Sequence, residues 1–359
     1  MKKIVLTGGG TAGHVTPNIA LLPALQAAGY EIAYVGSYEG IEKKLIADFN
    51  IPYTGISTGK FRRYLDPKNF SDPFRVMKGF VEARNYLKNY QPDVVFSKGG
   101  FVSVPVVRAA ASLHIPCIIH ESDMTPGLAN KLCIPVAEKV CCNFPETMKN
   151  IPADKAVLTG SPIRAELAQG SRLAGLNMCG FTANKPVIMV IGGSLGAANV
   201  NKAVRDALPK LLEDFQVVHL CGKDKIDNLL LNTPGYKQFE YIKAELKDIF
   251  AMADVVISRA GANAICELLA LKKPNVLIPL PAASSRGDQL LNAASFEAQG
   301  YSIVLNEDDI KTNLLGDKVH EFYFNRQNYV EAMSRSHQMD AVNTIMSLIN
   351  EAANKSHTQ

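Results

Sequence analysis

The chain carries the same three-part pattern twice: an apolar run, a glycine-rich turn and a helical run. The first turn is GGGTAGH at residues 8–14, and the second is GGSLGA at residues 192–197. Continuous apolar strands that alternate with helices are typical of parallel sheets that are covered on both faces. The repeat therefore predicts two doubly wound α/β domains in tandem, and a length of 359 residues suits two domains.

Short β-branched runs mark the expected strands, and amphipathic runs between them mark the helices. The strands are expected at Ile4–Thr7, Ile32–Val35, Val94–Ser97, Cys117–His120, Lys139–Asn143, Ala156–Thr159, Val187–Ile191, Gln216–Cys221, Val255–Ser258, Asn275–Pro279 and Ser302–Leu305. The helices are expected at Pro17–Ala28, Phe74–Tyr90, Ala198–Glu213, Ala262–Leu271 and Gln289–Gln299. We expect a polar loop at Gln169–Asn184, because that stretch is polar and contains glycine.

The domain boundary is expected near Gly160–Arg164, after the last strand of the first half. This gives an N-terminal domain at residues 1–162 and a C-terminal domain at residues 163–339, with a closing helix near 340–353 that packs back on the first domain. Ligands of such folds bind beyond the carboxyl ends of the strands. Two facing domains are therefore expected to form a cleft lined by these two sheet edges.

Composition and charge exclude several classes of function. A net charge of +4 is too small to indicate a nucleic-acid partner. The seven cysteines contain no C-x-x-C pair and most lie in apolar stretches, so they are expected to be buried thiols in a reducing compartment. The basic N-terminus runs into glycines rather than into the apolar core of a signal peptide. The apolar stretch Phe101–Ile119 includes Arg108 and His114, so it is not expected to span a membrane. We expect a cytoplasmic protein whose membrane contact is peripheral.

The loops of the first half offer candidates for acid–base chemistry. GGGTAGH is either a phosphate-facing loop or a tight strand-to-helix turn. His14, at a helix start, is expected to be neutral because of the positive helix end; it either accepts a proton from an attacking hydroxyl or only bonds nearby backbone. Glu121, at the end of another strand, either serves the chemistry by bonding a sugar hydroxyl or caps the next helix.

The loops of the second half suit a nucleotide sugar. GGSLGA places backbone amides and the Ser194 hydroxyl at a helix N-terminus, where a diphosphate can bind. Glu267 in SRAGANAICE either accepts both hydroxyls of a ribose or is a solvated helix residue. Gln289 and Asn292 share a helical face and either read sugar hydroxyls or act as a helix cap and surface amide.

No cofactor or metal site is expected. No D-x-D pair occurs in the chain. Glu307 and Asp309 have the spacing of an acidic metal pair, but they precede a helix, where capping is the better explanation. The charge of a leaving diphosphate would then be met by helix ends and Arg164.

In order along the chain, GGGTAGHVTP, SKGGFVSVP, HESDMTPGLAN, GSPIR, GGSLGA, SRAGANAICE and DQLLNA resemble the MurG family, the UDP-N-acetylglucosamine transferases of peptidoglycan precursor synthesis. The resemblance covers the whole chain. It implies the GT-B architecture, two Rossmann-like domains, with the acceptor and membrane on the N-terminal domain and the UDP-sugar on the C-terminal one. The implied reaction moves N-acetylglucosamine, with inversion, from UDP-N-acetylglucosamine to the 4-hydroxyl of undecaprenyl-diphosphoryl-N-acetylmuramoyl-pentapeptide (lipid I to lipid II) at the cytoplasmic face of the membrane.

The resemblance assigns His14 as the proposed base and carries over a set of donor-binding positions. These are Thr11, Ala12, Gly13, Arg164, Ser194, Ile242, Ala262, Asn263, Ala264, Ile265, Cys266, Glu267, Gln289 and Asn292. Two positions depart from the family pattern. Some members have Asn in place of Asp123, and some have two glutamines where this chain has Asp288 and Gln289, so only the second is carried over.

The segment from Lys60 to Lys88 combines basic and aromatic residues. It has eight basic and three acidic side chains, with aromatic residues between them. The basic residues are Lys60, Arg62, Arg63, Lys68, Arg75, Lys78, Arg84 and Lys88, and the interleaved aromatic ones include Phe61, Tyr64, Phe70, Phe74 and Phe80. This composition suits an anionic membrane surface. The alternative is a solvated helix face with aromatic residues in the core.

Two other functions stay open on the sequence. A UDP-N-acetylglucosamine 2-epimerase shares the two-domain architecture but needs no lipid acceptor. A nucleotide-binding regulatory protein would bind the same ligand without catalysis.

Overall fold

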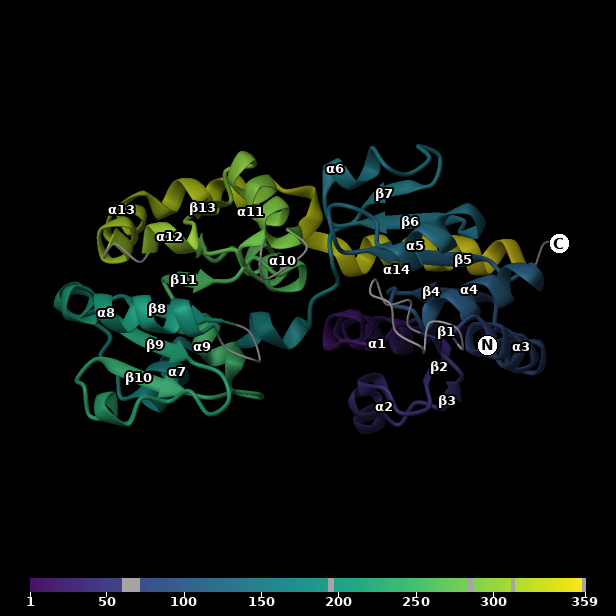
Figure 1. Ribbon diagram of the computed structural model, residues 1–359, viewed down its shortest axis with the longest axis horizontal. Coiled ribbons are helices and arrows are strands. Elements are labelled where there is room, and N and C mark those ends of the chain that lie inside the picture. The colour runs from purple at the N-terminus through teal and green to yellow at the C-terminus, as the bar shows by residue number, and fades with distance from the viewer. Residues whose placement is uncertain (60–71, 193–196, 283–286, 311–313, 357–359) are drawn as a thin grey trace. The chain divides into compact units, whose positions relative to one another are not determined.

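The computed structural model describes residues 1–59, 72–192, 197–282, 287–310 and 314–356 (Figure 1). The chain divides into two compact units. Unit 1 comprises Met1–Arg164 and Asp340–Gln359, and unit 2 comprises Ala165–Met339. Each unit is a parallel sheet flanked by helices, so the expected α/β class is confirmed for both.

Unit 1 is built on a seven-stranded parallel sheet with the order β3-β2-β1-β4-β5-β6-β7. Its strands are β1 Lys3–Thr7, β2 Glu31–Ser37, β3 Tyr53–Ile56, β4 Val94–Ser97, β5 Cys117–Glu121, β6 Lys139–Cys142 and β7 Ala156–Leu158. Its helices are α1 Thr16–Ala27, α2 Ile41–Ile46, α3 Asp72–Tyr90, α4 Ser103–Ser112, α5 Leu128–Cys133, α6 Pro145–Met148 and α14 Ala341–Ser356.

Alternate residues of these strands feed two separate cores. Val5 and Val95 face α3, α4 and α5 on one side of the sheet. Ile4 and Phe96 face α1 and α14 on the other side. Ile345 and Ile349 of α14 are fully buried in this second core, so the last helix of the chain is part of unit 1.

Unit 2 is built on a six-stranded parallel sheet with the order β10-β9-β8-β11-β12-β13. Its strands are β8 Val187–Ile191, β9 Gln216–Leu220, β10 Tyr236–Phe239, β11 Val255–Ser258, β12 Asn275–Leu277 and β13 Ser302–Val304. Its helices are α7 Arg172–Cys179, α8 Ala198–Asp214, α9 Leu246–Met252, α10 Ala262–Ala270, α11 Asp288–Ala298, α12 Glu307–Ile310 and α13 Leu314–Ser334.

The strands expected from the sequence are all present, but the expected loop at Gln169–Asn184 is wrong. Helix α7 lies within it. Its first turn is capped by Ser171, whose side chain accepts a hydrogen bond from the Ala174 amide at 3.2 Å, and it ends at Gly180 in the left-handed conformation. Gly175 allows α7 to approach α9 closely, because a methyl group there would come within 2.4 Å of the Asp248 carbonyl oxygen. The helix therefore depends on a cap and close packing rather than on a long apolar stripe.

Within the described part of the chain, no helix has both the length and the apolar character that a bilayer crossing requires.

Candidate active site

Each sheet reverses its strand order at one point, and the glycine-rich loops lie there. In unit 1 the reversal falls between β1 and β4, whose carboxyl ends lead into residues 8–14 and 98–102. In unit 2 it falls between β8 and β11, whose carboxyl ends lead into residues 192–197 and 259–261. Ligands of doubly wound sheets bind at such points. The topology thus gives each unit one candidate site.

The glycine loop of unit 1 is held by buried polar side chains. Glu42 of α2 accepts hydrogen bonds from the Gly10 amide at 3.1 Å and from the Ser37 amide at 2.9 Å. Burial raises the pKa of Glu42, but the hydrogen bonds from Ser37 and Gly10 outweigh it, and the net shift is downward. On the opposite side, the Tyr34 hydroxyl donates to the Gly8 carbonyl at 2.7 Å. Glu42 is therefore an ionised brace beneath the loop.

The two glycine loops of unit 1 touch backbone to backbone. The Gly9 amide donates to the Gly99 carbonyl at 3.3 Å. Gly100 has a φ of 85°, and a methyl group there would lie 2.3 Å from the Gly9 carbonyl oxygen. Only glycine combines this conformation with this approach. The loops at 8–14 and 98–102 therefore form one surface.

His14 ends the short 3-10 helix Ala12–His14 and is partly exposed. Its Nδ1 lies 3.0 Å from Thr11 Oγ1. Burial is the main cause that lowers the pKa of His14 to about 4, and the positive charge of Lys98 adds to it. The neutral imidazole agrees with the sequence-based expectation, but its causes are burial and Lys98 rather than a helix end.

Lys98 is a site residue that the motif SKGG did not reveal. It follows β4 and is 1% exposed. Its Nζ lies 2.8 Å from His120 Nδ1 and donates to Ser122 Oγ. His120 Nε2 lies 2.9 Å from the Gly160 carbonyl oxygen. The buried cation thus connects the ends of β4, β5 and β7.

Glu121 organises the loop that follows β5. Its Oε1 accepts from the Asp123 amide at 2.9 Å, and its Oε2 accepts from the Gly127 amide at 3.0 Å and from Asn130 Nδ2 at 2.8 Å. Gly127 is the N-cap residue of α5. Both oxygens are therefore engaged in shaping the loop, and the geometry favours the capping alternative over contact with a sugar.

In unit 2, α10 starts at the strand-order reversal with the predicted donor residues on its first turns. Ala262, Asn263 and Ala264 form the first turn of the helix, and the backbone amides of a first helical turn can bind an anion. Glu267, one turn further, is partly exposed. Ile265 and Cys266 point into the core, with 0% and 4% exposure, so their side chains are not available to a donor.

The two amides of α11 have different surroundings. Gln289 is partly exposed, and its Oε1 accepts from the Leu280 amide at 3.1 Å. Asn292 is 1% exposed, and its Nδ2 donates to the Ala260 carbonyl at 3.2 Å. Asn292 therefore holds the loop between β11 and α10. Its burial excludes the surface amide that the sequence left open.

Three further predicted positions lie apart from these helices in sequence. Ile242 follows β10, at the same sheet edge as α10, and its side chain is buried. Arg164 is the partly exposed last residue of the first segment of unit 1. Ser194 lies outside the described residues.

Glu307 and Asp309 have structural roles. Glu307 forms a buried ion pair with Arg259, the second residue of the SRAGAN motif. Asp309 Oδ2 accepts from the Asn306 amide at 3.1 Å and so caps α12. Across the described residues, His, Cys, Asp and Glu do not assemble in groups of three or more that would suit a metal ion.

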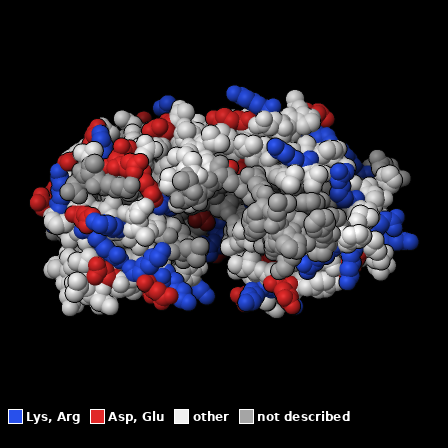
Figure 2. Space-filling view, in the orientation of Figure 1, with Lys and Arg blue, Asp and Glu red and all other residues white. Residues whose placement is uncertain are grey.

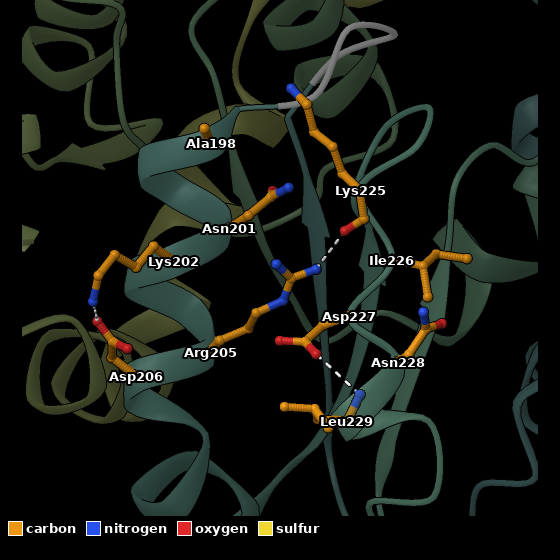
Figure 3. A pocket seen from close by; sticks show the side chains of 10 residues that line it. All are labelled: Ala198, Asn201, Lys202, Arg205, Asp206, Lys225, Ile226, Asp227, Asn228 and Leu229. Carbon is orange, nitrogen blue, oxygen red and sulfur yellow. Dashed lines mark hydrogen bonds and ion pairs between the residues drawn. The ribbon is translucent and has the colours of Figure 1, made fainter.

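A groove of about 710 Å³ lies in unit 2 between α8 and residues 225–229 (Figure 3). Arg205 crosses it and donates to the Lys225 carbonyl at 2.6 Å and to Gln238 Oε1 at 2.9 Å. Lys202 pairs with Asp206 at its rim. Charges of both signs are also interspersed over the visible face of unit 2 (Figure 2). The predicted site residues are not among those that line this groove.

Two models of one protein family match the chain. The glycosyltransferase family 28 N-terminal domain matches residues 4–142, and the family 28 C-terminal domain matches residues 187–349. The strand-order reversals of both sheets lie within these matches.

Close relatives match over nearly their whole length. A protein of Lachnospira eligens is 64% identical over 351 residues, which is 98% of this chain and 99% of the relative. A protein of Clostridium botulinum is 57% identical over 349 residues, 97% of this chain and 99% of the relative. Both are named UDP-N-acetylglucosamine--N-acetylmuramyl-(pentapeptide) pyrophosphoryl-undecaprenol N-acetylglucosamine transferase.

Solved structures share the fold. MurG of Acinetobacter baumannii is 28% identical, with a TM-score of 0.77 over 98% of this chain and all of that one. A UDP-GlcNAc 2-epimerase of Neisseria meningitidis, covering 98% of this chain and 100% of its own, has a TM-score of 0.65 at 12% identity, which shows a common fold alone. These similarities confirm the GT-B architecture, and the chain belongs to glycosyltransferase family 28, within its MurG group of N-acetylglucosamine transferases.

Proposed function

We propose that the chain transfers N-acetylglucosamine from UDP-N-acetylglucosamine to the 4-hydroxyl of a lipid-diphosphoryl-N-acetylmuramoyl-pentapeptide, the step from lipid I to lipid II in peptidoglycan biosynthesis. The observation that carries the proposal is the 64% identity to a named transferase over 98% of the chain. Both strand-order reversals, with their glycine loops, fall within that span. The donor is a nucleoside diphosphate sugar. The start of α10 offers backbone amide groups that can bind its diphosphate.

The donor is assigned to unit 2. The amides at the start of α10 would meet the diphosphate, and the Glu267 carboxylate would accept the ribose hydroxyls. Gln289 is the candidate for the sugar hydroxyls, because its side chain is partly exposed and already fixed by the Leu280 amide. Ser194 and Arg164 are assigned to the diphosphate and the Ile242 backbone to uracil, as the family resemblance implies.

The acceptor is assigned to unit 1, beside His14, and Thr11, Ala12 and Gly13 of the same loop are assigned to the sugar of the donor, as the family resemblance implies. The acceptor hydroxyl attacks the anomeric carbon as the bond to the UDP oxygen breaks, so the configuration inverts and UDP leaves with the bonding electrons. His14 takes the proton of the attacking hydroxyl. Its lowered pKa, about 4, keeps the imidazole neutral at neutral pH and therefore able to accept that proton.

The acceptor is a lipid, and α3 offers an exposed apolar stripe for the membrane surface. Phe74, Met77 and Val81 are 78%, 63% and 52% exposed and lie three and four residues apart, on one face of the helix. Arg75 and Lys78 are interspersed with them. Exposed apolar residues with basic residues beside them on a helix suit the anionic cytoplasmic face of a membrane.

Other parts of the predicted membrane segment differ. Phe80 packs against the core of unit 1 rather than facing outward. Some of the residues lie outside the described part of the chain; these are Lys60, Phe61, Arg62, Arg63, Tyr64, Lys68 and Phe70. The proposal for membrane binding therefore rests on α3.

The test is transfer of radiolabelled sugar from UDP-N-acetylglucosamine to a lipid-diphosphoryl-N-acetylmuramoyl-pentapeptide analogue. The expected product is a labelled lipid-linked disaccharide that forms only when both substrates are present. Conversion of the donor to UDP-N-acetylmannosamine without acceptor would identify an epimerase instead. Donor binding with neither product would indicate a regulatory nucleotide-binding protein.

A further inference from the structure

We propose that the connection between β2 and α2 is a second membrane anchor: Tyr38 and Ile41 enter an anionic lipid surface beside α3 and hold the first glycine loop close to that surface. The inference rests on the proposed function, which gives the chain a lipid-linked acceptor and assigns α3 to the membrane. It adds a contact outside the basic and aromatic segment from Lys60 to Lys88.

Two large apolar side chains stand out from this connection. Tyr38 directly follows β2 and is 52% exposed. Ile41 is the first residue of α2 and is 43% exposed. A half-exposed tyrosine suits the boundary of a bilayer, because its ring can enter the apolar layer while its hydroxyl keeps a polar partner. The two side chains therefore offer the connection a small apolar contact with lipid.

Tyr38 joins the connection to α3. Its hydroxyl donates to Glu82 Oε1 at 3.1 Å, and Glu82 Oε2 accepts from the Ser57 amide at 2.7 Å. The Tyr38 ring lies over β3, where a methyl group on Gly55 would come within 2.7 Å of Tyr38 Cδ1. Tyr38 is therefore fixed both to the sheet edge and to the helix that carries the exposed stripe.

The stripe of α3 reaches the same edge of the sheet as the connection. A methyl group on Gly79 would overlap the carbonyl oxygen of Ser57, the residue after β3. Further along α3, the Tyr90 hydroxyl donates to the Glu31 carbonyl at the start of β2 at 3.3 Å. Helix α3 therefore runs from the carboxyl ends of the strands to their amino ends. Its exposed stripe begins at Phe74, before Gly79, and so reaches past the carboxyl ends, where the connection leaves β2.

Basic side chains border these exposed apolar groups. Lys43 and Lys44 of α2 and Arg75 and Lys78 of α3 are exposed, and the two lysines of α2 outnumber Glu39, the exposed acid of the connection. A positive border favours anionic lipid over a neutral surface. The proposed acceptor is itself held in lipid, so a membrane is the occupant that the substrate brings to this edge.

The anchor is tied to the first glycine loop by one carboxylate. The amide of Ser37, the residue before Tyr38, donates to Glu42 Oε1 at 2.9 Å, and the Gly10 amide donates to Glu42 Oε2 at 3.1 Å. Glu42 directly follows Ile41. Contact of the connection with lipid therefore sets the height of the loop above the headgroups, and an acceptor whose diphosphate lies among the headgroups meets the loop without leaving the bilayer.

The chain contains no tryptophan, so a single Trp substitution reports on one position. Tyr38→Trp and Ile41→Trp probe the connection, and each serves if the other fails to fold. Phe74→Trp probes α3. Phe324→Trp is the matched control, because Phe324 is 78% exposed, as Phe74 is, but lies on α13 of unit 2.

The measurement is Trp emission with vesicles of phosphatidylcholine and phosphatidylglycerol whose acyl chains are brominated or plain, because bromine quenches a Trp that touches the chains. We expect the emission of Tyr38→Trp, Ile41→Trp and Phe74→Trp to move to shorter wavelength and to be quenched by the brominated lipid. The emission of Phe324→Trp should stay unchanged. Vesicles of phosphatidylcholine alone should quench less, because they lack anionic headgroups.

A second measurement connects the anchor with the reaction. The double variant Tyr38→Ser with Ile41→Ser should bind the anionic vesicles about tenfold more weakly. It should slow transfer to an acceptor held in vesicles more than transfer to a short-chain, water-soluble acceptor. Leu229→Ser with Leu231→Ser, at positions of unit 2 that are 94% and 53% exposed, is the control and should change neither.

The outcomes separate this inference from the proposals on which it rests. Quenching of Phe74→Trp without quenching of the two connection variants overturns the second anchor and leaves docking by α3 standing. Equal quenching of Phe324→Trp and Tyr38→Trp would show adsorption without a defined face and would also overturn it. Quenching of none of the four contradicts the membrane contact of α3 as well, whereas absence of transfer by the wild-type enzyme to the water-soluble acceptor contradicts the proposed function itself.

Discussion

Arg259 and Glu307 form an ion pair whose two side chains are each 9% exposed, at the sheet edge of unit 2 that carries the proposed donor site. Arg259 Nη1 also donates to the Ile278 and Pro279 carbonyls at 3.0 and 3.1 Å. Asn199 of α8 donates to Glu307 Oε2 at 2.9 Å. The pair therefore fixes the loops after β11 and β12 and the starts of α8 and α12 to one another.

Glu307→Ala should destabilise unit 2 by about 3–5 kcal/mol, because it leaves the Arg259 guanidinium buried without its carboxylate. The measurement is urea unfolding followed by circular dichroism. Asp309→Ala, which removes the hydrogen bond to the Asn306 amide, is the control and should cost about 1 kcal/mol. Equal effects of the two substitutions would contradict the role assigned to the pair.

Glu42→Gln should slow sugar transfer and lower the free energy of unfolding by about 2 kcal/mol, because an amide cannot accept all the hydrogen bonds from Ser37 and Gly10 that the carboxylate accepts. The exposed neighbour Glu39 provides the control substitution, Glu39→Gln. Steady-state transfer and unfolding are measured on both variants. Wild-type behaviour of Glu42→Gln would show that the glycine loop does not depend on this brace.

Glu267→Gln should weaken donor binding about tenfold, since a charged acceptor of ribose hydroxyls becomes a neutral one. Isothermal titration with UDP measures the change, and Glu213→Gln, at an exposed position of α8, is the control. The variant should retain the wild-type unfolding curve. An unchanged affinity for UDP would remove Glu267 from the ribose site.

Acid should destabilise unit 2 through His219. Burial, followed by the charge of Arg205, lowers the pKa of His219 to about 3, whereas an unfolded histidine titrates near 6.5. Above pH 6.5 neither state binds the proton, and stability is complete. As the pH falls from 6.5 toward 3, only the unfolded state gains the proton, so stability falls by about 1.4 kcal/mol per pH unit.

Urea unfolding at pH 7 and pH 5 tests this dependence. The loss of stability between the two should be about 2 kcal/mol smaller in His219→Gln than in wild type. His114→Asn, which changes an exposed histidine, should leave the loss unchanged. A His219→Gln variant with the full wild-type loss would show that His219 is not the group responsible.

Replacing Phe74 and Met77 together by serine should reduce binding to vesicles that contain anionic lipid, because the exposed apolar stripe of α3 is interrupted. Sedimentation with vesicles measures the bound fraction. Leu229→Ser is the control, because Leu229 is 94% exposed but lies in unit 2. If the double variant binds as the control does, α3 is not the docking surface.

The sequence predicted the central strands of both sheets because they are continuous apolar runs. It also predicted the edge strands β7 and β13, but it missed the other two edge strands, β3 and β10. In β10, Tyr236 and Gln238 are buried while Lys237 is exposed, so the strand lacks a continuous apolar run. A short sequence such as YKQF therefore carries a weaker strand signal than a continuous apolar run.

The candidate site shows the same division. The glycine loops, His14 and Glu267 were predicted because their residue types and spacing follow from chemistry near a helix start. The buried charges of Lys98 and of the Arg259–Glu307 pair were not predicted. Lys98 meets His120 across 22 residues, and Arg259 meets Glu307 across 48. Partners so distant in sequence are brought together only by the parallel crossovers, and a sequence does not reveal that a lysine at a strand end is buried.

The most direct test of the account is the anomeric configuration of the labelled disaccharide formed from UDP-N-acetylglucosamine and the lipid-linked acceptor, read by NMR of the purified product. We predict a new bond to the 4-hydroxyl of the muramoyl sugar in the β configuration, opposite to the α configuration of the donor. A product with retained configuration would contradict the direct displacement, and absence of the lipid-linked disaccharide would contradict the proposed transfer.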